Sequence, residues 1–239
     1  MNKIRLPKTL NKSHISFFVI AVLLFWLKTY AAYQIEFNLG IDNNLQKFLL
    51  LINPLSSALF FLGLALLFKK RTKLVMIIIN FFLSFLLYAN IAYYRFFNDF
   101  ITVPVLMQTK TNAGQLGDSA LSLISPFDIF YFLDTIILIV LALTVFKKVT
   151  VTNRKSYKMV LLFAITTFLF NLGLAEKDRP QLLTRSFDRN YLVKYLGAYN
   201  FTIYDVIQNI KSSSQRALAD SSDITDVENY RKANYAAPN

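Results

Sequence analysis

The chain has 239 residues, of which 55% are hydrophobic and 17% charged, whereas soluble domains typically carry ~25% charged residues. This composition indicates a membrane protein. The formal net charge is +12, but the basic residues stand in short runs between apolar stretches, a topology signal that argues against a nucleic-acid-binding face. The sequence has no cysteine and one histidine, His14, which excludes disulfides and metal sites built on several His or Cys ligands.

Five apolar segments follow one another along the chain. They lie at about 15–35, 48–68, 74–94, 127–146 and 158–175. Each is near the ~20 residues that a helix needs to cross ~30 Å of hydrocarbon. Strands are disfavoured, because an open sheet edge cannot be hydrogen-bonded in lipid. The sequence therefore predicts an all-α membrane protein with a five-helix transmembrane domain at 1–175.

The distribution of charge predicts the orientation of these spans. Basic residues gather before the first span, between the second and third spans, and between the fourth and fifth. The two other connections carry few basic residues, and acidic residues balance them. Because basic connections stay cytoplasmic, we expect the N-terminus inside and everything after about residue 176 outside.

Two charged residues lie within predicted spans, Lys28 in the first and Asp134 in the fourth. At ~1.5 Å per residue, each lies about 10 Å from the outer end of its span. Charges in spans are costly and face a bundle interior or a wet cavity. Two interpretations stay open: an ion pair that fixes helix packing, or an outward-facing pocket for a phospholipid headgroup, with Lys28 or Arg95 near the phosphate. The polar residues assigned to this outer region are Lys28, Asn90, Arg95, Asp134 and Asn171.

A tyrosine-rich stripe follows the last span. Phe187, Tyr191, Tyr195 and Tyr199 recur at steps of four, the spacing of one helix face. Such a stripe could lie in the membrane interface or pack on the outer loops. The sequence predicts an extracellular amphipathic juxtamembrane segment at 176–211 and a flexible linker at 212–239.

Within that linker, Ala217-Leu218-Ala219 has the A-x-A form that signal peptidase cleaves after, so a cut would leave Asp220 as a new N-terminus. The predicted orientation places this motif on the outer side, where the protease works. The polar residues around the motif predict an extended, accessible backbone. The tripeptide is common, and it stands about 40 residues beyond the fifth span, where an ordinary signal peptide leaves only a few. A chance match therefore stays open.

Three stretches carry a family resemblance: EKDRPQLLTRSFDRNYLVKYLGAYNFTIYD at 176–205, LLYANIAYYRFFNDF at 86–100 and LKTYAAYQIEFNLG at 27–40. They resemble the N-terminal membrane part of the lipoteichoic acid synthases of Gram-positive bacteria. The resemblance implies five membrane helices, a linker and a large extracellular domain of sulfatase-like or alkaline-phosphatase-like fold. That domain would move glycerol phosphate from phosphatidylglycerol onto a growing polyglycerol-phosphate chain, with a threonine nucleophile and a manganese ion. The resemblance also implies cleavage by signal peptidase at an A-x-A after the fifth helix, which Ala217 and Ala219 match.

The sequence ends at Asn239, inside what the resemblance makes the linker. We therefore expect the catalytic threonine and the metal ligands outside it, and a membrane domain without activity of its own. The implied partners are phosphatidylglycerol, signal peptidase, the extracellular catalytic domain and envelope-assembly proteins. Two alternatives stay open: a small lipid transporter or flippase, which the lack of internal repeats disfavours, and the membrane domain of a related phosphoethanolamine transferase, from which the 176–205 text points away.

Overall fold

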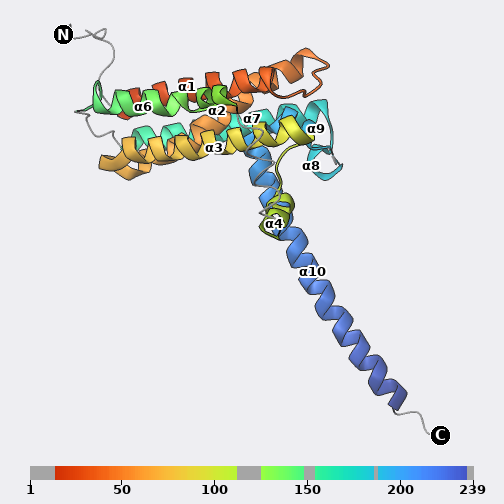
Figure 1. Cartoon of the computed structure of the whole chain (residues 1–239). Helices are drawn as coiled ribbons and strands as arrows, with labels where there is room; N and C mark the ends of the chain where they lie inside the picture. The colour runs from red at the N-terminus through yellow and green to blue at the C-terminus, as the bar shows by residue number, and fades with distance from the viewer. Residues whose placement is uncertain (1–13, 112–124, 148–153, 186–187, 236–239) are drawn as a thin grey trace.

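The computed structural model describes residues 14–111, 125–147, 154–185 and 188–235, and these ranges contain helices and no strand. Five helical segments are long and apolar enough to cross a membrane, which confirms the predicted fold class. They run side by side in the bundle of Figure 1. The spans are α1 (His14–Ile35), α2 (Asn44–Leu64) with the 3-10 helix η1 (Ala65–Arg71), α3 (Thr72–Phe97), η2 (Pro126–Phe132) with α6 (Leu133–Leu143), and α7 (Arg154–Asp178).

Helix α2 lies at the centre of the bundle and packs against α1, α3 and α7. Of its most apolar stretch 67% is buried within the protein, against 17% for α7, so α7 presents most of its surface to lipid. Pro54 stands inside α2, where its missing N–H leaves a carbonyl of the preceding turn without a helical partner. The hydroxyls of Ser56 and Ser57 donate to the carbonyl of Asn53 at 2.9 and 3.2 Å, which adds polar contacts beside this break in the backbone ladder.

Short polar side chains set the helix ends at one end of the bundle. Asn43 caps α2 by accepting a hydrogen bond from the backbone N–H of Gln46 at 2.8 Å. Ser125 and Asp128 form a capping box that starts η2. Helix α3 stops at Asn98, which adopts the left-handed conformation at φ 52°. These ends, together with the loop at 36–43, lie at what we call the α9 end of the bundle.

The described parts of two basic connections lie together at the opposite end. Lys73, at the start of α3, donates to the backbone carbonyl of Phe146, just beyond the end of α6, at 2.7 Å. The KKRTK run at 69–73 therefore lies beside the beginning of the connection from α6 to α7. This grouping agrees with the charge pattern from which the cytoplasmic side is predicted.

The chain beyond α7 returns into the bundle. It forms α8 (Leu182–Arg185), α9 (Arg189–Leu196) and α10 (Ala198–Tyr235), and α9 packs on α2 and α7. Tyr199, in the first turn of α10, is 1% exposed; its ring lies 5.0 Å from that of Phe25, and its hydroxyl donates to the carbonyl of Leu83 at 3.3 Å. Leu83 lies 14 residues before the end of α3, which is about 21 Å along a helix. Tyr199 thus reaches deep into the bundle, well beyond the interface or the outer loops that we expected to cover the stripe. Phe187, the first residue of the stripe, lies outside the described residues.

Helix α10 then leaves the bundle as one continuous helix (Figure 1). It contacts α4 (Val103–Thr111) on its way, and it passes without interruption through the boundary expected at residue 211. The structure differs here from the flexible, extended linker expected for 212–239, of which it describes residues up to 235. Residues 198–235 contain neither glycine nor proline, so nothing in the local sequence breaks the helix.

Candidate functional site

The predicted ion pair forms the floor of a polar site inside the bundle. The ammonium of Lys28 lies 2.6 Å from Asp134 Oδ2 and donates to Ser84 Oγ at 2.5 Å. The side-chain amide of Asn80 donates to Asp134 Oδ2 at 2.9 Å and to Thr135 Oγ1 at 2.8 Å. The Lys28 and Asp134 side chains are 8% and 2% exposed. The predicted contact between helices α1 and α6 is confirmed, and α3 supplies further hydrogen-bonding groups for both charges.

A second charged cluster lies nearer the α9 end. Arg95 donates to both carboxylate oxygens of Glu36, from Nε at 2.9 Å and from Nη2 at 2.7 Å. Its Nη1 donates to Asp128 Oδ1 at 2.8 Å, and the hydroxyl of Tyr131 donates to Glu36. The hydrogen bond from Arg95 holds the pKa of Glu36 below its ordinary value, against the opposing effect of partial burial. The cluster ties the end of α1 to α3 and η2.

A pocket of about 350 Å³ lies between the two clusters. Lys28 reaches it from the first cluster, and Glu36, Arg95 and Asp128 line it from the second. Two apolar lining residues, Ile35 and Phe127, are 76% and 74% exposed. The pocket therefore combines paired charges in its wall with apolar side chains that would face lipid.

Asn90 and Asn171 do not join this pocket. Asn90 donates to the carbonyl of Leu86 at 2.9 Å and accepts from the backbone N–H of Ile101 at 3.1 Å, so it holds the chain that follows α3. Asn171 donates to Asn53 and joins α7 to α2. Of the five polar residues assigned to the outer region, the structure brings Lys28, Arg95 and Asp134 to the pocket and its floor.

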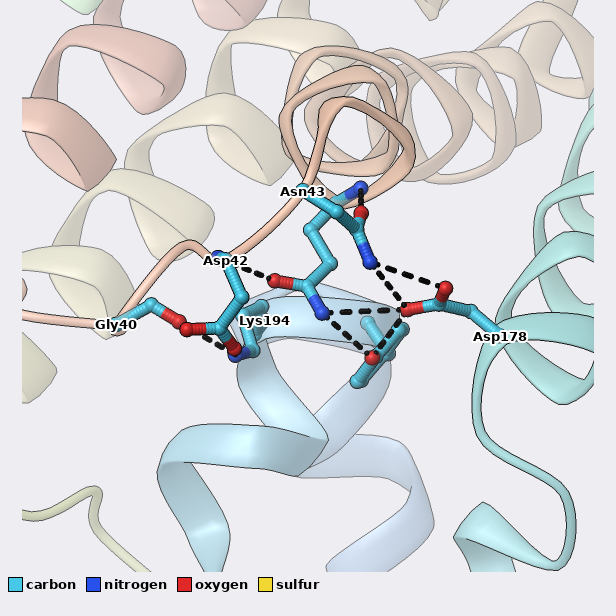
Figure 2. A network of polar contacts seen from close by, with 7 residues as sticks. Gly40, Asp42, Asn43, Asp178 and Lys194 are labelled. Atoms are coloured by element: carbon cyan, nitrogen blue, oxygen red, sulfur yellow. Dashed lines mark hydrogen bonds and ion pairs between the residues drawn. The ribbon is translucent and has the colours of Figure 1, made fainter.

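The sequence analysis missed a polar network at the α9 end of the bundle (Figure 2). Its first half is centred on Lys194 of α9, which is 1% exposed. The ammonium donates to the carbonyl of Gly40 at 2.6 Å, lies 3.3 Å from Asp42 Oδ2, and lies 4.4 Å from the ring centroid of Tyr191. A lysine is rarely buried. Its position on the same helix face as the tyrosines is the signal that could have identified it.

The second half of the network is centred on Asp178 at the end of α7. This carboxylate accepts from Asn43 at 3.1 Å, from Gln46 at 3.2 Å and from the hydroxyl of Tyr195 at 2.5 Å. Burial, aided by the hydrogen bond to Asp178, raises the pKa of Tyr195 to about 12. The network fastens α9 to the loop between α1 and α2 and to the end of α7 (Figure 2).

The A-x-A motif lies far along α10. Ala217 and Ala219 are exposed, and Asp220 continues the same helix. Counted from the buried Tyr199, Ala219 is 20 residues along, or about 30 Å at the rise of an α-helix. The motif therefore stands clear of the bundle, in helical backbone that a protease would have to unwind locally.

Sequence comparisons identify relatives along nearly the whole chain. It is 66% identical over 226 residues to lipoteichoic acid synthase 2 of Bacillus subtilis (strain 168), a match that covers 94% of this chain and 35% of the relative. It is 53% identical over 240 residues to lipoteichoic acid synthase 1 of that strain, covering 97% and 36%. The lipoteichoic acid synthase of Staphylococcus aureus (strain USA300) is 41% identical over 229 residues, covering 94% and 35%. The chain thus spans about a third of the length of these relatives.

The family comparison agrees with these relatives and with the architecture. No solved structure matches the chain. Residues 1–218 match the family described as lipoteichoic acid synthase N-terminal domain, a range that includes the five membrane-spanning helices of the described residues, the pocket and the buried start of α10. The resemblance seen in three short stretches thus extends to the complete bundle, and this chain belongs to the lipoteichoic acid synthase N-terminal domain family.

Proposed function

We propose that this chain anchors an extracellular glycerol-phosphate transferase and holds it in a defined position at the membrane. That transferase would use phosphatidylglycerol to build polyglycerol phosphate in the Gram-positive cell envelope, and it would carry the manganese ion. The names of the relatives support this activity, and they do not favour the transporter or phosphoethanolamine transferase alternatives.

The buried start of α10 carries the positioning role. An anchor alone needs only a flexible tether, whereas this tail is fixed at several points. The backbone N–H of Ala198 donates to the hydroxyl of Tyr33 at 2.8 Å, and Asn53 donates to the carbonyl of Lys194 at 3.2 Å. Outside the bundle, Asp205 accepts from the N–H that begins α4 at 2.6 Å. A helix held in this way transmits the orientation of the bundle to whatever follows it.

Signal peptidase would end this coupling by cutting after Ala219. The charge pattern supports an outer position for the motif, and the exposure of the motif on α10 supports access by the protease once the helix unwinds locally. The cut would leave a five-helix remnant that keeps the buried start of α10, and it would release the extracellular piece.

The test compares two replacements of SSSQR at 212–216 in the full-length protein, each with the A-x-A changed to prevent cleavage. One replacement is five glycines, which favour a flexible chain; the matched control is five alanines, which keep the helix. Both are reconstituted in liposomes that contain phosphatidylglycerol, and polymer synthesis is compared with turnover of a soluble substrate analogue. We expect the glycine variant to lose polymer synthesis severalfold while soluble turnover stays equal. Equal polymer synthesis in both variants would mean that the chain anchors the transferase without positioning it.

A further inference from the structure

The charges around the pocket are fully paired. Two cations, Lys28 and Arg95, face three carboxylates, of which Glu36 and Asp128 line the pocket and Asp134 holds Lys28 from below. The formal charge of these five groups is therefore −1. A phosphate entering this space would meet cations that are already neutralised and would add a further negative charge to a partly desolvated site, which is unfavourable. The pairing thus argues against the phosphate position that the sequence suggested beside Lys28 or Arg95.

The pocket wall nevertheless has both hydrogen-bond donors and hydrogen-bond acceptors that remain unused. Among the described residues, Lys28 uses two of the three N–H groups of an ammonium, and Arg95 uses three of the five of a guanidinium. Asp128 accepts one bond at each oxygen, from Arg95 and from the backbone of Ser125, and each carboxylate oxygen has room for two. Spare donors next to spare acceptors match hydroxyl groups, which donate and accept, better than phosphate oxygens, which only accept.

The rim of the pocket suits a lipid that enters from the side. The rings of Phe127 and Phe130 lie nearly parallel, with centroids 6.3 Å apart, and both residues are exposed. With Ile35, at the end of α1, they give the opening an apolar edge where acyl chains can pack. The volume, about 350 Å³, is near the lower bound of ~300 Å³ for small-molecule sites. It has room for a headgroup, with the acyl chains left outside in the bilayer.

We propose that this pocket binds the hydroxyl-bearing headgroup of an uncharged lipid: the free glycerol hydroxyl of a diacylglycerol or the sugar of a glycosyl-diacylglycerol. The hydroxyls take the spare positions on Lys28, Arg95 and Asp128, and the ring faces of Phe127 and Phe130 pack on the C–H groups of the headgroup. This site requires the membrane-embedded bundle and does not depend on the proposed transferase activity.

The experiment fills the pocket without removing a charge. Ala31 lines the pocket and is exposed, so Ala31→Phe adds a ring to the empty space. Leu23→Phe, at an exposed position on the same helix, is the matched control. Binding of diacylglycerol, glucosyl-diacylglycerol and phosphatidylglycerol to each purified protein in detergent is measured by native mass spectrometry, and thermal unfolding reports the fold of each variant.

For the wild-type chain and Leu23→Phe, we expect one uncharged lipid to bind at least about tenfold more tightly than phosphatidylglycerol, a difference of about 1.4 kcal/mol. Ala31→Phe should lose this preference and keep its unfolding temperature. The diacylglycerol and glucosyl-diacylglycerol arms identify which headgroup is held. Tighter binding of phosphatidylglycerol, or undiminished binding by a folded Ala31→Phe protein, would overturn the proposal. Neither result would affect the liposome test of positioning, which depends on α10.

Discussion

Replacing Lys28 by methionine should destabilise the bundle more than replacing Asp134 by leucine. When Lys28 is lost, the short Asp134 side chain, 2% exposed, keeps the Asn80 amide at 2.9 Å and has no route to water. When Asp134 is lost, the long Lys28 side chain can swing into the pocket that it already lines. Removing one partner of a buried pair costs about 3–5 kcal/mol, and a retained hydrogen bond offsets about 1 kcal/mol. We therefore expect a loss of about 3 kcal/mol in the free energy of unfolding for Lys28→Met and about 2 kcal/mol for Asp134→Leu.

The double variant decides whether these costs come from the pair. With both charges replaced by apolar side chains, the loss should shrink to about 1 kcal/mol, because no unpaired charge remains in the bundle. The assay is a double-mutant cycle of denaturant unfolding in one detergent. Arg189 and Asp99, an ion pair whose side chains are 40% and 31% exposed, provide the control, and removing either should cost no more than about 1 kcal/mol. If the double variant loses as much as the two single variants together, the pair does not stabilise the bundle and the reasoning fails.

Three further predictions concern the tail and the orientation. Gly197→Ala should lower the free energy of unfolding by about 2 kcal/mol, because Gly197 has φ 82° and an added Cβ would meet another Cβ at 2.9 Å; Gly173→Ala, where nothing lies within 4 Å, should be harmless in the same assay. Ala217→Leu should prevent release of the extracellular piece from the full-length protein, and N-terminal sequencing of the wild-type piece should begin directly after the A-x-A; any other start makes the motif a chance match. Asn38 and Lys70 are exposed positions at opposite ends of the bundle. An impermeant thiol reagent on intact cells should label Asn38→Cys and leave Lys70→Cys unlabelled. The reverse pattern would show that the orientation is opposite to the predicted one.

The five spans could be predicted because the bilayer fixes the length of an apolar helix, whatever its neighbours. The predicted first span, at about 15–35, agrees with α1 (His14–Ile35) to within one residue at either end. The contact between Lys28 and Asp134 could be predicted for a related reason. Two charges at one depth in adjacent helices have few other partners in lipid, so matched depth was enough to bring them together.

The pairing of Arg95 could not be predicted in the same way. It lies at the end of its span, where water and several loops compete for it, and its partners Glu36 and Asp128 are 59 and 33 residues away in the sequence. The burial of the tail could not be predicted from the sequence either. A stripe of tyrosines indicates that one helix face is covered, but membrane interface, loop and bundle all satisfy that pattern. Which of the three covers the stripe is decided by long-range contacts with Tyr33 and Asn53. The spacing of residues within the stripe carries no information about these contacts.

The insertion of α9 and α10 sets an order of assembly. Tyr33 and Asn53 belong to the first two spans made, yet their partners Ala198 and Lys194 lie 165 and 141 residues further along the chain. At ~5–20 residues per second, synthesis of that interval takes roughly 7–30 s, during which both side chains sit in the nascent bundle without these bonds. The segment after α7 must therefore be synthesised and must fold back into the bundle before the first helices reach their final packing. Folding of the domain is therefore complete only when α9 and the start of α10 have packed onto the bundle.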